Sequence, residues 1–199
     1  INNPAKMKPE REAALCLQCH RRDVTASEWH GAAHAKARVG CSKCHDMHGT
    51  PQASKMLRKA VPDLCFGCHP QQRAEFRQNS HHPVLEGRMS CLDCHDPHRK
   101  NVKSALGQGG NDLCASCHAD KEGPFVYAHD TGNGDGTDAC LACHRSHGSP
   151  HPQLQRVTGR SVCQQCHVDK ITHNPGGTCW QVGCHVDIHG SNRDPRFLR

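Results

Sequence analysis

The chain has few of the side chains that normally fill a protein interior. Only 4% of its 199 residues are aromatic, and 35% are hydrophobic even when its sixteen cysteines are included. A chain of this length folds around a sizeable apolar core, which leucine, valine and phenylalanine do not supply here. We therefore expect a bound group to occupy the interior.

Long apolar runs are also missing. No stretch approaches the roughly 20 residues of a membrane-spanning helix, and the sequence shows no signal-peptide pattern. We expect Ile1 to be a mature or trimmed N-terminus. The formal charge of +6 would by itself suit an acidic partner such as nucleic acid.

Cysteine and histidine are abundant instead. Every cysteine belongs to a C-x-x-C-H motif or, in the last case, to a variant with four residues between its cysteines. The cysteine pairs are Cys16 and Cys19, Cys41 and Cys44, Cys65 and Cys68, Cys91 and Cys94, Cys114 and Cys117, Cys140 and Cys143, Cys163 and Cys166, and Cys179 and Cys184.

This motif is the signature of covalent haem c attachment. Positions i, i+3 and i+4 of a helical turn share one face, so two thiols can form thioethers while the histidine reaches the iron. Disulfides would not place a histidine after every second cysteine, and zinc needs further ligands for each pair. The sequence predicts eight covalently bound haems c, with two residues of the last motif looped out around Gly183.

The motifs form an internal repeat. The first cysteines of alternate motifs, Cys16, Cys65, Cys114 and Cys163, follow one another at intervals of 49 residues. This period predicts one multihaem domain over 1–199, built from four di-haem units at about 10–58, 59–107, 108–156 and 157–199. We expect mostly coil with short α-helices and little or no β-structure, in an elongated repeat around a chain of haems.

The nineteen histidines allow two axial ligands for every iron. The motif histidines are the predicted proximal ligands: His20, His45, His69, His95, His118, His144, His167 and His185. The predicted distal ligands recur at repeated positions: His34, His48, His81, His98, His129, His147, His173 and His189. Repeat register favours His34 over His30 and His81 over His82, and both alternatives stay open.

Short spacing constrains which iron a distal histidine reaches. His45 and His48 are three residues apart, a span of at most about 10 Å. That length cannot carry the chain around the edge of a macrocycle to its other face. His48 and its equivalents are therefore expected to bind a haem other than the one in the adjacent motif, so neighbouring haems lie close together.

The chain resembles the MtrA/DmsE-type periplasmic multihaem cytochromes. The resemblance rests on the segments 80–84, 87–91, 94–98 and 189–198 and extends over nearly the whole chain. Most members carry ten haems, so the chain is most similar to the octahaem periplasmic component of an outer-membrane porin–cytochrome conduit. This implies three partners: an outer-membrane β-barrel porin, an extracellular multihaem cytochrome and periplasmic electron-donor cytochromes.

These observations predict an electron-transfer protein rather than an enzyme. Every motif ends in histidine, and enough histidines remain to close every iron. Each haem brings two propionates, which offset the positive charge and argue against nucleic acid. We expect the protein in the periplasm, associated with or embedded in the outer membrane through its partner, with transfer to an extracellular cytochrome. The alternatives are a soluble periplasmic shuttle to a terminal reductase or a subunit of an extracellular filament.

Overall fold

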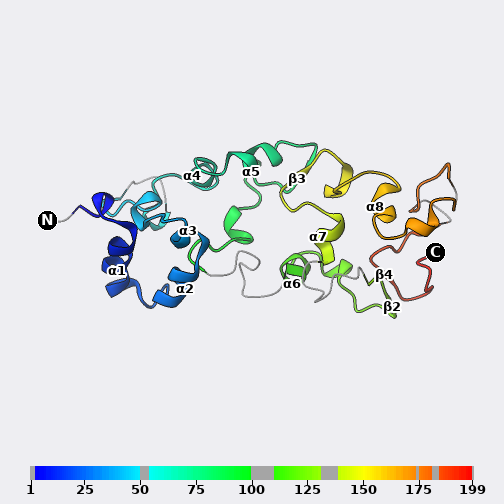
Figure 1. Cartoon of the computed structure of the whole chain (residues 1–199), viewed down its shortest axis with the longest axis horizontal. Helices are drawn as coiled ribbons and strands as arrows, with labels where there is room; N and C mark the ends of the chain where they lie inside the picture. The colour runs from blue at the N-terminus through cyan, green and yellow to red at the C-terminus, as the bar shows by residue number, and fades with distance from the viewer. Residues whose placement is uncertain are drawn as a thin grey trace. The chain divides into compact units, whose positions relative to one another are not determined.

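The computed structural model of the chain consists of short helices and turns joined by irregular segments (Figure 1). It describes residues 3–49, 54–99, 110–130, 139–173, 175–180 and 184–198. The α-helices are α1 (Pro9–His20), α2 (Ala26–Gly31), α3 (Ala33–Lys36), α4 (Asp63–Phe66), α5 (Pro70–Glu75), α6 (Gly110–Ala115), α7 (Ala139–Cys143) and α8 (Ser161–Gln164). The 3₁₀ turns are η1 (Pro4–Lys6), η2 (Cys41–Lys43), η3 (Ser54–Met56), η4 (Cys91–Asp93), η5 (Ala119–Lys121), η6 (Pro152–Leu154) and η7 (Val168–Lys170).

In the described residues, four strands of two residues each are present, together with three isolated β-bridges. The strands are β1 (Ser80–His81), β2 (Tyr127–Ala128), β3 (Gly148–Ser149) and β4 (Gly190–Ser191). β1 pairs with β3 and β2 with β4, both antiparallel. The expectation of mostly coil, short helices and little β-structure is confirmed.

Local signals explain the longest helices. α1 begins with Pro9 and carries Glu10 and Glu12 in its first turn, where the helix dipole favours acidic side chains. α2 begins at a capping box, in which the Thr25 hydroxyl accepts from the Glu28 backbone and the Glu28 carboxylate accepts from the Thr25 backbone. These signals fix where the helices start but supply little buried surface.

Contacts divide the chain into two compact units. The first comprises Ile1–Ala74 and Pro83–Gln108, and the second comprises Glu75–His82 and Gly109–Arg199. The segment Glu75–His82 belongs to the second unit because β1, which lies in this segment, pairs with β3. Each unit is described by itself below.

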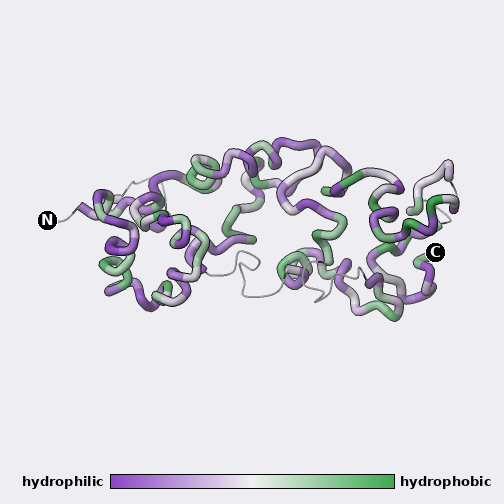
Figure 2. Tube along the Cα trace, in the orientation of Figure 1, coloured by the Kyte–Doolittle hydropathy of each residue, from purple (hydrophilic) through white to green (hydrophobic). Residues whose placement is uncertain are grey.

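The apolar core is small, as the composition predicts. Among the described residues, the buried apolar side chains are Ala13, Trp29, Ala32, Phe66, Phe76 and Val84. Figure 2 shows short apolar stretches scattered along the trace between polar ones. Within the described segments, no helix is both long and apolar enough to cross a bilayer.

Candidate haem sites

Seven of the attachment motifs close the same type of backbone turn. In six of them the amide of the motif histidine donates to the carbonyl of the first cysteine at 2.9–3.0 Å, as His45 does to Cys41. The motif Cys16–His20 lies at the end of α1. A helical turn of this kind presents both thiols and the imidazole on one side, as thioether attachment requires.

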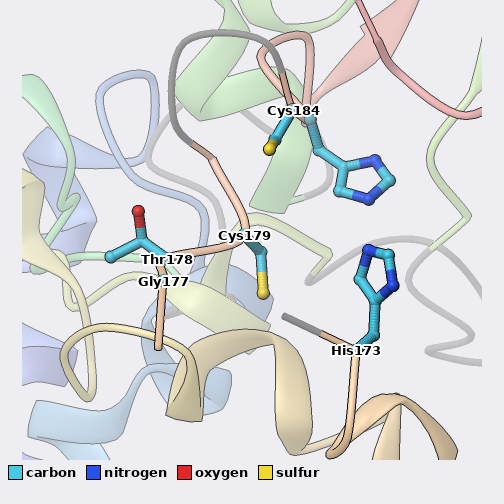
Figure 3. A pocket seen from close by; sticks show the side chains of 6 residues that line it. His173, Gly177, Thr178, Cys179 and Cys184 are labelled. Atoms are coloured by element: carbon cyan, nitrogen blue, oxygen red, sulfur yellow. The ribbon is translucent and has the colours of Figure 1, made fainter. Parts of the chain in front are cut away.

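The eighth motif reaches the same closure despite its longer spacer. The His185 amide donates to the Cys179 carbonyl at 3.1 Å. A small pocket is lined by Cys179, Cys184, His173 and His185, and Figure 3 shows the side chains of Cys179, Cys184 and His173 around it. The two extra residues therefore do not prevent the backbone of His185 from closing on that of Cys179, as in the other motifs. The loop expected around Gly183 lies outside the described residues.

Six motif histidines face a second histidine ring. The ring centroids are 6.0–6.4 Å apart in the pairs His34 and His69, His45 and His98, His82 and His118, His129 and His167, His144 and His189, and His173 and His185. Every pair joins one motif histidine to one histidine outside the motifs.

The geometry of these pairs suits two axial ligands of one iron. The centroid distance hardly varies, whereas the angle between ring planes ranges from 14° to 77°. Two metal–nitrogen bonds of about 2.0 Å, plus about 1.1 Å from each nitrogen to its ring centre, predict a separation of about 6.2 Å. Rotation about the ligand axis leaves that distance unchanged, so a fixed distance with variable angle is expected.

The donor sets do not suit zinc. In the described part of the chain, no cluster of three or more histidine, cysteine, aspartate or glutamate side chains could hold a metal ion. Two imidazoles per site instead match haem iron, whose other four ligands come from the porphyrin.

Hydrogen bonds orient the imidazoles. Nδ1 donates to a backbone carbonyl in five of the paired histidines: His34 to Pro97 at 3.3 Å, His45 to Lys55 at 3.1 Å, His82 to Ser146 at 2.6 Å, His144 to Gln153 at 2.8 Å and His185 to Arg196 at 2.5 Å. These bonds fix the tautomer and leave Nε2 for a metal. Burial lowers the pKa of His98 and of His189, which favours the neutral form that can bind iron.

The carbonyls that accept from His45 and His144 belong to a turn that occurs twice in the chain. Lys55 and Gln153 have positive φ angles of 55° and 54°. The chain then returns to the motif through isolated β-bridges from His45 to Leu57 and from His144 to Gln155. The left-handed residues are locally unfavourable, and here they turn the acceptor carbonyl towards the imidazole. Sequence reasoning did not find this turn.

The short strands position the distal histidines. His82 directly follows β1, and His147 directly precedes β3, with His81 opposite Gly148 in the register. His129 and His189 have the same relation to β2 and β4, with Ala128 opposite Gly190. Each two-residue pairing thus brings two histidines from outside the motifs to its ends.

The structure bears on the choice between His30 and His34 and on that between His81 and His82. His34, not His30, faces a motif histidine, as the register favoured. At the second choice the geometry differs from the register: His82 faces His118, while Nδ1 of His81 donates to the Gln78 carbonyl at 2.6 Å. His98 and His189 face His45 and His144 rather than the histidine of the adjacent motif.

The other predicted ligands have different surroundings. His20 contacts Asp23 through Nδ1, and the His48 backbone amide donates to Asp46. In the described part of the chain, no second histidine ring is seen opposite His20 or His48. His95 and His147 belong to different compact units.

Cysteines of consecutive motifs meet. Side-chain hydrogen bonds link Cys16 to Cys41, Cys65 to Cys91 and Cys163 to Cys179. Cys44 lies near Cys68, and Cys143 near Cys166. Burial raises the pKa of the Cys44 and Cys143 thiols, and the neighbouring cysteine raises it further. The first unit therefore holds its four motifs in sequence order, and the second unit holds the last three in the same way.

Two comparisons with known proteins agree with this geometry. One relative, the multiheme cytochrome MtrA of Shewanella baltica (strain OS185), is 32% identical over 100 residues, which are 50% of this chain. The match covers 29% of that relative's length. The doubled CXXCH motif family matches 34–74, 81–123 and 133–172, more than half of the chain. Its copies join the second motif of one predicted unit to the first motif of the next. The chain therefore belongs to the doubled CXXCH motif family of multihaem cytochromes.

Proposed function

We propose that the chain is an octahaem electron relay with two histidines on every iron. The pairs of facing rings supply the ligands for six irons, with His82 in place of His81 at the iron of His118. His20, His48, His95 and His147 complete the set. All eight motifs end in histidine, which leaves no position set apart for a substrate and supports electron transfer over catalysis.

The observation that carries this proposal is the contact between cysteines of consecutive motifs. Each thioether sulfur would lie one carbon from the edge of its porphyrin, so sulfurs in contact would bring two macrocycle edges close together. Side-chain hydrogen bonds join Cys16 to Cys41 and Cys65 to Cys91, and Cys44 lies near Cys68, so neighbouring sulfurs follow one another through the first unit. Electrons would pass from motif to motif in sequence order within that unit.

The protein's own residues hold and separate the redox centres. Haem iron supplies one-electron exchange between its ferric and ferrous forms. The cysteines would fix each porphyrin, and the carbonyls that accept from Nδ1 hold imidazoles such as those of His45 and His144 in one orientation. Such fixed ligands limit reorganisation when the charge on the iron changes.

The haem content can be checked directly. A pyridine haemochrome assay should give eight haems per chain, and the dithionite-reduced protein should bind no carbon monoxide. Seven haems would remove the site at Cys179 and Cys184. Carbon monoxide binding by the unaltered protein would show an open iron and reopen the enzyme interpretation.

For the cellular role, we propose an extracytoplasmic relay within an outer-membrane conduit. Periplasmic cytochromes would donate electrons, a β-barrel porin would hold the protein, and an extracellular multihaem cytochrome would accept them. The support is the resemblance and the partial match to MtrA. The native protein should extract only with detergent and in one complex with a porin. Extraction without detergent would favour a periplasmic shuttle, and a long polymer in electron micrographs would favour a filament subunit.

A further inference from the structure

One predicted distal ligand donates to a carboxylate in a sheltered position. Nδ1 of His147 lies 2.9 Å from Oε2 of Glu75, and the two side chains are 27% and 21% exposed. Backbone carbonyls instead accept from Nδ1 of His34, His45, His81, His82, His144 and His185. The comparable pair of His20 and Asp23 also measures 2.9 Å, but its side chains are 60% and 73% exposed.

The surroundings of Glu75 hold this contact in place. The buried Phe76 ring lies with its centroid 5.3 Å from that of His147. Gly148 approaches the Glu75 backbone so closely that an added Cβ would lie 1.9 Å from the Glu75 carbonyl oxygen. His147 directly precedes β3, and the pairing of β3 with β1 also holds this residue in place. The carboxylate thus meets the imidazole at a set position with little water between them.

A carboxylate acts on an imidazole more strongly than a carbonyl does. An ionised acceptor draws the Nδ1 proton towards itself, which makes Nε2 a stronger electron donor to a metal. Stronger donation stabilises ferric iron relative to ferrous iron. The effect is larger where water does not screen the charge.

We propose that Glu75 is a positioning residue that lowers the reduction potential of the iron bound by His147. The inference rests on the proposed role of His147 as an axial ligand. The step concerned is the transfer of one electron from a neighbouring ferrous haem to this ferric iron, with no bond broken and no proton released. A lowered potential would make this iron harder to reduce than it would be without the Glu75 charge.

The test is a spectroelectrochemical titration of the full chain with all haems attached. Glu75→Gln keeps an acceptor oxygen but removes the charge, so one component of the titration should shift to a more positive potential. Glu75→Asp keeps the charge on a shorter side chain, so the potential of this component should lie between the values in the parent protein and in Glu75→Gln. Asp23→Asn is the matched control, because the same contact at an exposed site should give a smaller shift. Each variant must first show the haem content of the parent protein.

A double-mutant cycle separates this role from a structural one. His147→Met removes the Nδ1 donor and should itself shift one component to a more positive potential. Adding Glu75→Gln to His147→Met should then give no further shift of that component. An equal shift in both backgrounds would overturn the inference, as would no shift from Glu75→Gln alone. If His147→Met moves no component, the proposed ligand role of His147 fails instead.

Discussion

At the scale of single residues, His81 and His82 show how one position changes a ligand. Adjacent residues of an extended segment point to opposite sides, so only one of the two can face His118. The repeat register favours His81 because Glu75 and Phe76 precede it by the same offset as Glu28 and Trp29 precede His34. The first segment continues into α2 and α3, whereas the second extends into β1. Rise per residue differs about twofold between helix and strand, so equal offsets do not reach equivalent positions.

This difference gives a direct test of the ligand at the iron of His118. His82→Ala should leave that iron with one axial histidine, and the reduced protein should bind carbon monoxide at about one haem in eight. The ferric form should gain a matching high-spin signal. His81→Ala is the matched control and should leave both spectra unchanged. The reverse result would restore His81 as the ligand.

His98 provides a second test at the residue scale. Its ring faces His45 at 6.0 Å, so His98→Met should raise the potential of the haem at Cys41 and Cys44. The haem at Cys91 and Cys94 should keep its potential, although it is attached next to His98 in the sequence. Combining His98→Met with Cys41→Ala and Cys44→Ala identifies the component, since the shifted signal should then disappear. A shifted signal that persists would assign His98 to another iron.

At the scale of elements, the motif turns could be predicted and the strands could not. The spacing of C-x-x-C-H specifies a helical turn, because the chemistry needs three side chains on one face. Strands of two residues show no periodicity that a sequence window could detect. Their presence follows from the close approach of the Glu75 backbone at Gly148 and of the Phe125 ring at Gly190, which depends on residues distant in the sequence. The turns at Lys55 and Gln153, whose carbonyls accept from His45 and His144, could not be predicted for the same reason.

Gly190 tests whether the β2–β4 pair positions a ligand. Its φ of +147° is rare for other residues, and an added Cβ would lie 2.2 Å from the Phe125 ring. Gly190→Ala should therefore displace β4 and the adjacent His189, at a cost of about 1–3 kcal/mol in stability. A lower melting temperature should accompany carbon monoxide binding at the iron of His144.

The control for this variant is Gly176→Ala. Among the described residues, no atom lies within 4 Å of a Cβ added at Gly176, so stability and ligation should stay unchanged. If Gly190→Ala matches the parent protein in both measurements, β4 does not position His189.

At the scale of the whole molecule, the composition predicts that haem fills the interior, but it does not predict which histidine binds which iron. The low aromatic content and the repeated motifs lead to haem because no other group uses these residues at this spacing. The repeat also shows that histidines are available for every iron. The choice of iron depends on how segments of the chain meet in space, as when His34 reaches His69. A one-dimensional pattern holds no such information.

The same scarcity of apolar side chains predicts that the chain does not fold without haem. The buried apolar cluster of Ala13, Trp29 and Ala32 is too small to offset the chain entropy lost on folding. Apoprotein produced without haem attachment should show the circular dichroism of an unfolded chain and no cooperative thermal transition. The protein with its haems attached is the control and should retain helical signal to a defined melting temperature. A cooperative transition in the apoprotein would mean that the polypeptide forms its own core, and the paired histidines would then be a consequence of folding rather than one of its causes.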